Sequence, residues 1–345
     1  MKPKLVLDQH FRTIEELFTP DDFDKLRETC EVVGGGDRPL SAAELDASLD
    51  SMAFLVAAHP RLDRATLDRA ANLKAVIEVA GTFRAGLDYE ACFARGIEVL
   101  SCAPGFRQSV AEMTVGLMLA GARSIVAEHE AFRDGGEHWK GDNDGTDFTL
   151  YRQDIGFVGY GSIARECTRL LLPFAPRIRA FDPWLGASGA ELEDVELVDL
   201  DTVVRQSRCL VVTASPTDEN WQLIGGREIG MMPPGTLLVL VSRAHLVDFD
   251  AVLAAASAGR IRAAIDVFPH EPVPPDDPIR STPNVILSPH RAAAVPGGRQ
   301  LIGAMIAGDV ADMVAGRRPS RLQRADPARI AHVVGAPAAA QRKSA

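Results

Sequence analysis

The stretch 159–164 is the first candidate for chemistry because of its residue types and their spacing. It reads Gly-Tyr-Gly-Ser-Ile-Ala, follows an apolar run typical of a buried parallel strand and begins a helical pattern. Gly159 would permit a tight turn, and Gly161 would let the backbone approach a pyrophosphate bound at the helix N-terminus, by Ser162 and Ile163. The pattern predicts a dinucleotide-binding turn; the alternative is a strand–helix turn whose glycines serve packing alone.

Asp182 stands about 20 residues after the first glycine, the spacing expected of an acidic ribose ligand, at the end of a second predicted strand. A carboxylate there can accept hydrogen bonds from an adenosine ribose and would repel a 2′-phosphate. The next residues are Pro183 and Trp184, so no arginine stands ready for that phosphate. We therefore expect the cofactor to be NAD rather than NADP.

Further polar side chains follow predicted strands. Because ligands of open parallel sheets bind outside the carboxyl ends of the strands, we expect these side chains to meet in one crevice. They are, in chain order, Asp182, Ser215, Arg243, Asp266 and His290, with Glu271 in the loop after Asp266.

The elements that must position these residues follow from the apolar pattern. Runs that suit strands alternate with helical patterns, which predicts an α/β protein with parallel sheets. The predicted strands are 5–7, 32–33, 52–55, 75–79, 97–100, 155–158, 178–181, 209–213, 236–241, 261–265 and 285–287.

Helix boundaries can also be predicted. Thr19 would cap a helix that begins at Pro20, and Ser41 with Glu44 has the form of a capping box. A long helix is expected from Ser109 to about Phe132. The polar, Gly-rich segment 134–147 is either an interdomain linker or an arm across a partner subunit, and 325–345 is expected to fray.

Composition restricts the class of protein. The 345 residues suffice for two domains, and 46% hydrophobic and 24% charged residues are ordinary for a globular protein. The net charge of −10 argues against nucleic acid and anionic membranes as partners.

The five cysteines lack disulfide or metal spacing, so we expect buried free thiols, no metal site and a reducing, cytoplasmic compartment. The first residues contain no signal-peptide core, and no apolar run is long enough to span a membrane.

From about Leu73 to Pro319, the sequence resembles the D-isomer-specific 2-hydroxyacid dehydrogenases, NAD-dependent enzymes that include D-3-phosphoglycerate dehydrogenase and glyoxylate/hydroxypyruvate reductase. Besides the glycine turn with Asp182, four motifs carry the resemblance in the family's order and spacing. They are S-P-T-D-E-N-W-Q-L-I-G at 215–225, M-P-P-G-T-L-L-V-L-V-S-R-A-H-L-V-D at 232–248, A-A-I-D-V-F-P-H-E-P at 263–272 and S-P-H-R-A-A at 288–293.

The resemblance implies two Rossmann-like domains, with a flavodoxin-like substrate domain split around an inserted, doubly wound NAD-binding domain. The substrate domain would comprise 1–122 and a C-terminal helix with its tail at 299–345, and the NAD-binding domain would comprise 123–298. The length suggests no additional regulatory domain. The long helix and the 134–147 segment resemble the family's dimer contacts, so a homodimer is expected.

The resemblance also assigns catalytic roles. Arg243 would hold the carboxylate and carbonyl oxygen of a 2-oxo acid, for which a planar guanidinium is suited. His290 would be the acid and base, and Glu271 would pair with it, favour its protonated form and orient the ring. The neighbouring His270 and the more distant His245 are expected at the surface.

Cofactor and substrate contacts are implied as well. Asp266 would receive the nicotinamide carboxamide. The backbone N–H groups of Gly81, Thr82 and Phe83 would bind the substrate carboxylate, with Thr82 also near the nicotinamide. The residues expected to line the cofactor are Ala214, Ser215, Pro216, Val241 and Ser242.

Departures from the family pattern concern the substrate. Phe83 replaces a usual glycine, and Arg84 adds a cation beside the expected carboxylate site. The stretch Ser101 to Gln108 lacks the family's asparagine, as does the position before Arg243. The reaction type can thus be predicted, but the particular 2-hydroxy acid cannot.

Two alternatives to the dehydrogenase remain open. An NAD(H)-binding regulatory protein on the same fold would keep the same residues, although the acidic charge argues against a corepressor. A formate or phosphite dehydrogenase is the second alternative. In formate dehydrogenases of this superfamily a glutamine partners the histidine, and Glu271 argues against that.

Overall fold

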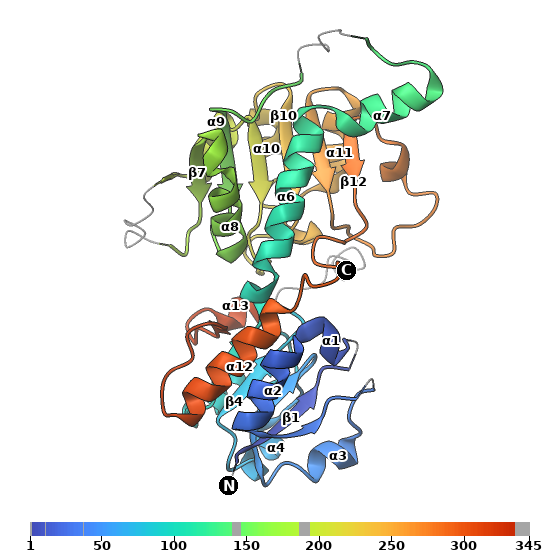
Figure 1. Cartoon of the computed structure of the whole chain (residues 1–345). Coiled ribbons are helices and arrows are strands. Elements are labelled where there is room, and N and C mark those ends of the chain that lie inside the picture. Colours follow the sequence, from blue (N-terminus) through green and yellow to red (C-terminus); the bar gives the residue numbers. More distant parts are fainter. Residues whose placement is uncertain (1, 11, 37, 140–145, 186–193, 335–345) are drawn as a thin grey trace. The chain divides into compact units, whose positions relative to one another are not determined.

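The computed structural model describes residues 2–10, 12–36, 38–139, 146–185 and 194–334. Residues 140–145 of the predicted arm and 335–345 of the predicted tail lie outside the described residues. The chain divides into two compact units (Figure 1). Unit 1 consists of Met1–Ser109 with Ala293–Ala336, and unit 2 contains Val110–Ala292. The sequence placed the boundaries at residues 122 and 298, and the roles of the units stay predictions.

Unit 1 is built on a six-stranded sheet with the order β13-β5-β4-β3-β1-β2. Strands β1 to β5 are parallel, and β13 pairs antiparallel with β5. The strands are β1 (Lys4–Asp8), β2 (Glu31–Gly34), β3 (Met52–Ala57), β4 (Ala75–Glu78), β5 (Glu98–Ser101) and β13 (Gln323–Arg324). The helices are α1 (Ile14–Leu17), α2 (Pro20–Thr29), α3 (Ala42–Asp46), α4 (Arg64–Arg69), α5 (Tyr89–Ala94), α12 (Leu301–Val314) and α13 (Ile330–Val334), with a 3₁₀ turn η1 (Ala103–Phe106).

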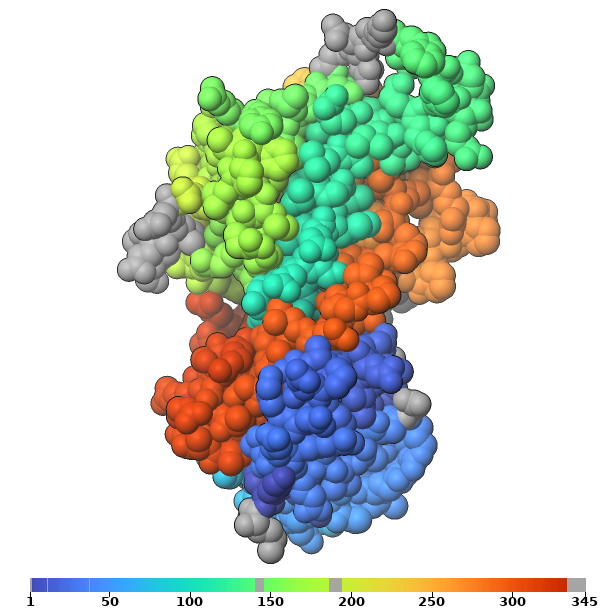
Figure 2. Space-filling view, viewed as in Figure 1, coloured from blue at the N-terminus to red at the C-terminus, as the bar shows by residue number. Residues whose placement is uncertain are grey.

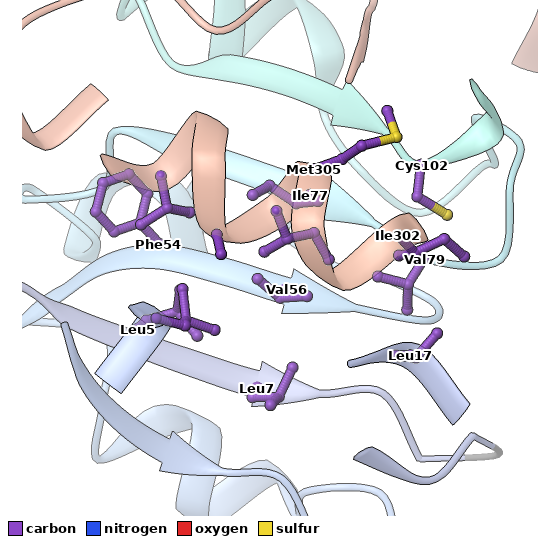
Figure 3. Close-up of a cluster of buried hydrophobic side chains, with 14 of the residues drawn as sticks. Leu5, Leu7, Leu17, Phe54, Val56, Ile77, Val79, Cys102, Ile302 and Met305 are labelled. Atoms are coloured by element: carbon purple, nitrogen blue, oxygen red, sulfur yellow. The ribbon is translucent and has the colours of Figure 1, made fainter. Parts of the chain in front are cut away.

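One core of unit 1 joins the two ends of the chain. Figure 3 shows Ile302 and Met305 of α12 above Leu5, Val56 and other apolar side chains of the sheet. A Cβ atom at Gly303 would lie 2.5 Å from the carbonyl oxygen of Leu17. The absence of a side chain at Gly303 therefore allows α12 to pack closely against the end of α1. Figure 2 shows the C-terminal segment, in orange and red, against the blue N-terminal helices.

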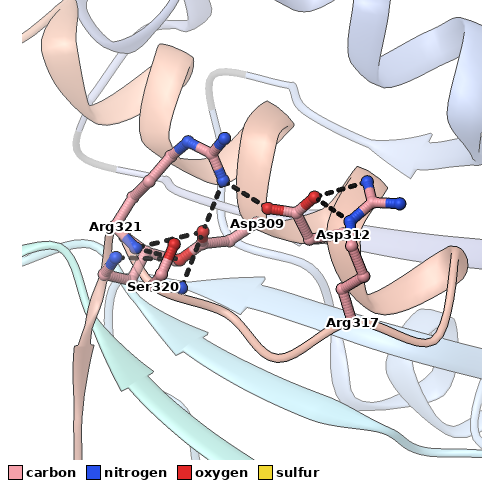
Figure 4. Close-up of polar contacts among 6 residues, drawn as sticks. Asp309, Asp312, Arg317, Ser320 and Arg321 are labelled. Atoms are coloured by element: carbon pink, nitrogen blue, oxygen red, sulfur yellow. Dashed lines mark hydrogen bonds and ion pairs between the residues drawn. The ribbon is translucent and has the colours of Figure 1, made fainter.

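A buried carboxylate fastens the chain after α12. Asp309 is fully buried and accepts hydrogen bonds from the backbone N–H groups of Ser320, Arg321 and Leu322 (Figure 4). The guanidinium of Arg321 also contacts Asp309 at 3.0 Å. These bonds direct the chain into β13, beside β5. A buried charge is stable when it is paired and hydrogen-bonded in this way.

Unit 2 contains a seven-stranded parallel sheet with the order β12-β11-β10-β9-β6-β7-β8. Successive strands run outward from β6 to β8, and the chain then returns to β9 on the other side of β6. In such sheets the switch point, here between β6 and β9, is where ligands bind. The strands are β6 (Asp154–Val158), β7 (Arg177–Phe181), β8 (Val195–Leu197), β9 (Cys209–Val212), β10 (Thr236–Leu240), β11 (Ile261–Ile265) and β12 (Val285–Leu287).

Helices cover this sheet, and α6 runs along one of its faces (Figure 1). A Cβ atom at Gly121 of α6 would lie 2.7 Å from the side chain of Leu237 in β10, which shows how closely they pack. The helices are α6 (Arg107–Ala122), α7 (Ile125–Asp134), α8 (Ser162–Leu171), α9 (Leu200–Gln206), α10 (Gly226–Met231) and α11 (Phe249–Ser257).

Most local predictions are confirmed. Each predicted strand is present within a residue or two, and the five cysteines are buried free thiols. Thr19 and Ser41 cap their helices as expected. The single long helix was wrong, because Ser124 adopts a left-handed conformation (φ 49°) and separates α6 from α7. Its hydroxyl donates to Asp147, a bond that short-range patterns do not reveal.

Two further findings, both limited to the described residues, concern membranes and metals. No single helix among the described residues is long and apolar enough to cross a membrane. The pair Ala103–Ala122 and Ile125–Asp134, bent by 56°, passes that test by length and composition only. Within the same described ranges, no group of three or more His, Cys, Asp or Glu residues is placed to hold a metal ion.

Candidate functional site

The glycine turn of unit 2 joins β6 to α8. Gly159 has φ of +87°, and a Cβ atom there would lie 2.4 Å from the Cα of Ala214. Only glycine therefore fits, and the turn packs directly on the segment that follows β9. The N–H of Ala214 donates to the carbonyl of Val158 at 2.9 Å. The residues predicted at 159–161 and 214–216 are thus neighbours at the switch point.

Gly161 serves a different purpose. It is the N-cap of α8, has ordinary φ of −82° and has no side-chain cap hydrogen bond. A Cβ atom there would meet nothing within 4 Å. The protein's own packing therefore does not demand glycine at 161, whereas an uncapped helix N-terminus with open space suits an anionic group. Residues 161–163 fit a dinucleotide pyrophosphate.

Asp182, directly after β7, is held by two backbone donors. One carboxylate oxygen accepts from the N–H of Tyr160 at 2.8 Å and the other from the N–H of Trp184 at 2.9 Å. The first bond ties the carboxylate to the glycine turn. Each oxygen keeps a further lone pair, so the carboxylate remains able to accept from ribose hydroxyls.

The segment after β10 contains Arg243, the residue predicted to bind the substrate carboxylate. Val241 and Ser242 are buried, and Arg243 is exposed. The Oγ of Ser242 has no hydrogen-bond partner within the described part of the chain. An orphaned buried hydroxyl fits the prediction that Ser242 contacts a bound group. One Nη atom of Arg243 donates to the carbonyl of Ser242 at 2.7 Å.

Asp266, at the end of β11, is fully buried and holds the loop after β12. One carboxylate oxygen accepts from the Oγ of Ser288 and the N–H of Arg291, and the other accepts from the N–H of Ala292 at 3.1 Å. These three donors flank His290. Sequence reasoning assigned Asp266 to the nicotinamide, which stays a prediction, and missed this positioning role.

His290 and Glu271 form a hydrogen-bonded pair. The Nδ1 of His290 lies 2.7 Å from one carboxylate oxygen of Glu271, and the other oxygen accepts from the N–H of Phe268 at 2.9 Å. The two side chains are 43% and 37% exposed. With Nδ1 donating to the carboxylate, Nε2 is left for another partner, as an acid or base requires.

The other histidines of unit 2 differ. His270 is exposed, as predicted. The prediction for His245 was wrong: it is 5% exposed, contacts the carbonyl of Thr217 at 2.6 Å and packs edge-on against Trp221. Its polar partner and aromatic neighbour come from the 215–225 segment, which explains the burial.

In unit 1 sequence reasoning missed Glu78, the last residue of β4, whose carboxylate bonds the turn that follows. Glu78 is 2% exposed. Its carboxylate accepts from the backbone N–H groups of Ala80, Gly81 and Thr82, the last two at 2.9 Å, and from the Oγ of Ser101 at 3.1 Å. The sequence feature that could have revealed it is a single carboxylate within an otherwise apolar predicted strand.

The Glu78 carboxyl has an altered acidity. Burial raises its pKa to about 7, although hydrogen bonds from Ala80, Thr82 and Ser101 oppose the rise. Two of the N–H groups predicted to bind a substrate carboxylate, those of Gly81 and Thr82, are thus engaged by a carboxylate of the chain itself.

Phe83 and Arg84 continue this turn. Phe83 is 7% exposed and its ring meets that of Tyr89 edge-on, so the side chain belongs to the core of unit 1. Arg84 is exposed, with one Nη atom 3.2 Å from Nδ1 of His59. Burial lowers the pKa of His59, and the positive charge of Arg84 adds to that effect.

Comparison with known proteins was made through sequence and structure. Residues 115–292 match the family described as D-isomer specific 2-hydroxyacid dehydrogenase, NAD binding domain. The chain is 31% identical over 265 residues to D-3-phosphoglycerate dehydrogenase of Archaeoglobus fulgidus, covering 76% of this chain and 50% of that protein. It is 31% identical over 310 residues to glyoxylate reductase of Thermofilum pendens, covering 86% of this chain and 89% of that protein.

Solved structures have the same architecture. A phosphoglycerate oxidoreductase from Rhizobium etli superimposes with a TM-score of 0.82 at 34% identity, covering 94% of this chain and 99% of that one. An NADPH-dependent glyoxylate/hydroxypyruvate reductase from Sinorhizobium meliloti, in complex with citrate, has a TM-score of 0.70 at 22% identity, covering 93% and 98%, and supports the fold alone.

These matches confirm the predicted α/β fold with two Rossmann-like domains and the family resemblance. The chain spans about half the length of the D-3-phosphoglycerate dehydrogenases that it matches, at 50% and 51%. It covers most of the glyoxylate reductase. By the family match across 115–292 and the identity to full-length relatives, the chain belongs to the D-isomer-specific 2-hydroxyacid dehydrogenase family.

Proposed function

We propose that this protein is an NAD-dependent oxidoreductase that transfers a hydride between NAD(H) and a D-2-hydroxy acid or its 2-oxo acid. The single observation that carries the proposal is the 2.7 Å contact between Nδ1 of His290 and Glu271. A carboxylate hydrogen-bonded to Nδ1 orients a histidine ring so that Nε2 can act as a general acid or base. Family membership supports the same reaction class.

In the proposed reaction, the nicotinamide cofactor supplies or accepts the hydride when it is bound. His290 donates a proton from Nε2 to the carbonyl oxygen during reduction and removes the hydroxyl proton during oxidation. Glu271 stabilises the imidazolium and fixes the ring through Nδ1. Arg243 binds the substrate carboxylate and polarises the carbonyl with its guanidinium.

We propose NAD rather than NADP as the cofactor because of Asp182. Its carboxylate would accept from the ribose hydroxyls and repel a 2′-phosphate. Residues 161–163 would bind the pyrophosphate, and the cofactor would be lined by 214–216, Val241 and Ser242. Asp266 and Thr82 would contact the nicotinamide end.

We also propose a homodimer in the cytoplasm, with a small 2-hydroxy or 2-oxo acid as the substrate and no nucleic acid or membrane as partner. Exposed apolar side chains support the dimer: Ile125, Phe132 and Trp139 are 54%, 59% and 73% exposed, on and just after α7. Such clustered apolar exposure is typical of an interface. Light scattering at micromolar concentration tests it, and a monomer would contradict it.

The direct test of the function is the oxidation of NADH in the presence of a panel of 2-oxo acids, with NADPH in parallel. We expect turnover of at least one acid and faster turnover with NADH. Tight NADH binding without turnover of any acid would support the NAD(H)-binding regulatory alternative. Reduction of NAD by formate or phosphite alone would support that type of dehydrogenase.

A further inference from the structure

The turn after β4 directs three consecutive backbone N–H groups at a carboxyl group of the chain itself. Consecutive N–H groups of Ala80, Gly81 and Thr82 all point at the carboxylate of Glu78. Gly81 has φ of +89°, which brings successive N–H groups to one side of the chain. Such a group of backbone donors is a general binding site for carboxylates and phosphates.

The turn is held in this shape by more than Glu78. A Cβ atom at Gly81 would lie 2.6 Å from the ring of Phe106, so the turn packs tightly on the residue that ends η1. The Oγ of Ser101 bonds the carboxylate at 3.1 Å and also accepts from the N–H of Ala103 at 3.2 Å. Of these contacts, the packing of Gly81 on Phe106 does not involve the carboxylate.

We propose that Glu78 is a specificity-determining residue whose carboxylate competes with an external carboxylate for the N–H groups of Ala80, Gly81 and Thr82. An external carboxylate binds there only when Glu78 withdraws or loses its charge. The inference rests on the proposed function, together with the implication of the family resemblance that the N–H groups of Gly81 and Thr82 bind the substrate carboxylate beside Arg243. When its carboxylate is charged, Glu78 therefore weakens the binding of any 2-oxo acid whose carboxylate must occupy this turn.

The competition depends on pH. The groups that face the Glu78 carboxyl are Arg12 after β1, Cys102 after β5 and Tyr89 of α5. Burial raises the pKa of Glu78 to about 7, and an anion bound beside it raises that pKa further. Binding of an external carboxylate is thus linked to uptake of a proton, so its affinity increases as the pH falls through about 7.

The test uses oxamate, a non-reducible analogue of a small 2-oxo acid, and the full chain saturated with NADH. Calorimetric titration at pH 6 and pH 8 compares the unaltered protein with Glu78→Ala and Glu78→Gln. We expect Glu78→Ala to bind oxamate at least about tenfold more tightly at pH 8, with a smaller difference at pH 6. Ser101→Ala is the matched control, because it removes one bond to Glu78 and leaves the N–H groups occupied; its affinity should change less than about twofold.

The outcomes separate the two proposals. Equal or weaker oxamate binding by folded Glu78→Ala would overturn the inference and make Glu78 a support of the turn. If Glu78→Ala fails to fold, the oxamate affinity of Glu78→Gln tests the inference. Glutamine keeps the size of the glutamate side chain, but the affinity of this variant for oxamate should no longer differ between pH 6 and pH 8. Failure of every variant to bind oxamate would also overturn it. Tighter binding without any NADH oxidation would leave the inference standing and defeat the proposed dehydrogenase.

Discussion

Within each of the two units, single carboxylates hold segments of the chain in place. Glu271 bonds the ring of His290, and Asp266 accepts from the hydroxyl of Ser288 before it and from the backbone N–H of Arg291 after it. Asp182 fixes the glycine turn through Tyr160, and Glu78 fills the turn after β4. Because carboxylates accept several hydrogen bonds at once, one residue can order a whole loop.

Glu78 should make stability depend on pH. Its pKa rises from 4.5 to about 7 on folding, so the folded state binds the proton more tightly. This contribution to the free energy of unfolding is fully present below about pH 4.5 and is lost as the pH rises to about 7. The change is on the order of 3 kcal/mol.

Urea unfolding between pH 5 and pH 8 measures this effect. The glutamine of Glu78→Gln does not titrate. The free energy of unfolding of this variant should therefore lack the part of the decline between pH 5 and pH 8 that Glu78 causes. Parallel curves for the variant and the unaltered protein would show that Glu78 does not titrate in this way.

Asp266 should act on His290 through the backbone. Asp266→Asn replaces one accepting oxygen by an NH₂ group, which cannot accept from the three donors that Asp266 bonds. The segment 288–292 should therefore shift. A misplacement of about 1 Å costs on the order of 10²-fold in rate, and we expect kcat to fall by about that factor, in addition to any weakening of NADH binding from the proposed nicotinamide contact. Stopped-flow kinetics with fluorescence titration measures both. A weaker NADH Kd with kcat preserved would show that Asp266 contacts the nicotinamide but does not position His290.

The pairing of Glu271 with His290 could be predicted from the sequence, whereas the hydrogen bonds of Glu78 could not. Glu271 and His290 lie in two family motifs with fixed spacing. Glu78 bonds the N–H groups of Gly81 and Thr82, which pattern reasoning assigned to a substrate carboxylate. Asp266, assigned to the nicotinamide, bonds the loop that carries His290. Which donor a buried carboxylate meets depends on the approach of loops, such as the 22-residue separation between Asp266 and Ser288.

At the scale of elements, the unit formed by β6, the glycine turn and α8 was predicted because each signal is local. The strand is apolar, Gly159 needs positive φ, and α8 has its apolar face at helical spacing. The break between α6 and α7 was missed because Ser124 bonds Asp147, 23 residues later. Local patterns determine where elements form, and long-range bonds determine where they stop.

The two glycines of the turn should respond differently to alanine. Gly159→Ala introduces a Cβ atom 2.4 Å from the Cα of Ala214 at φ of +87°, so the free energy of unfolding should fall by at least about 2 kcal/mol. Gly161→Ala meets no atom within 4 Å and should cost less than about 1 kcal/mol.

The effect of Gly161→Ala should appear in the binding of NADH and not in stability. A methyl group at 161 would project toward the space assigned to the pyrophosphate, so Gly161→Ala should bind NADH at least about tenfold more weakly while remaining stable. Urea unfolding and NADH fluorescence give the two quantities. Unchanged NADH affinity in Gly161→Ala would place the pyrophosphate elsewhere.

At the scale of the whole molecule, the chain leaves unit 1 after Ser109 and returns to it at Ala293. The resemblance predicted this order. The contacts that hold the returning segment in unit 1 could not be predicted from the sequence. Asp309 accepts hydrogen bonds from the backbone of Ser320 to Leu322, and Gly303 packs against the carbonyl oxygen of Leu17. Both depend on contacts between distant parts of the chain, which composition and periodicity do not report.

The central claim is that His290 is the acid and base of an NAD-dependent dehydrogenase. The most direct measurement is kcat for the fastest 2-oxo acid in His290→Ala, with the Kd of NADH measured alongside. Its matched control is His270→Ala, an exposed histidine 20 positions earlier. We expect kcat to fall by about 10²–10⁴-fold in His290→Ala with NADH binding preserved, and to stay near the unaltered value in His270→Ala. If His290→Ala keeps most of its turnover, or if His270→Ala loses it, the assignment of the acid is contradicted.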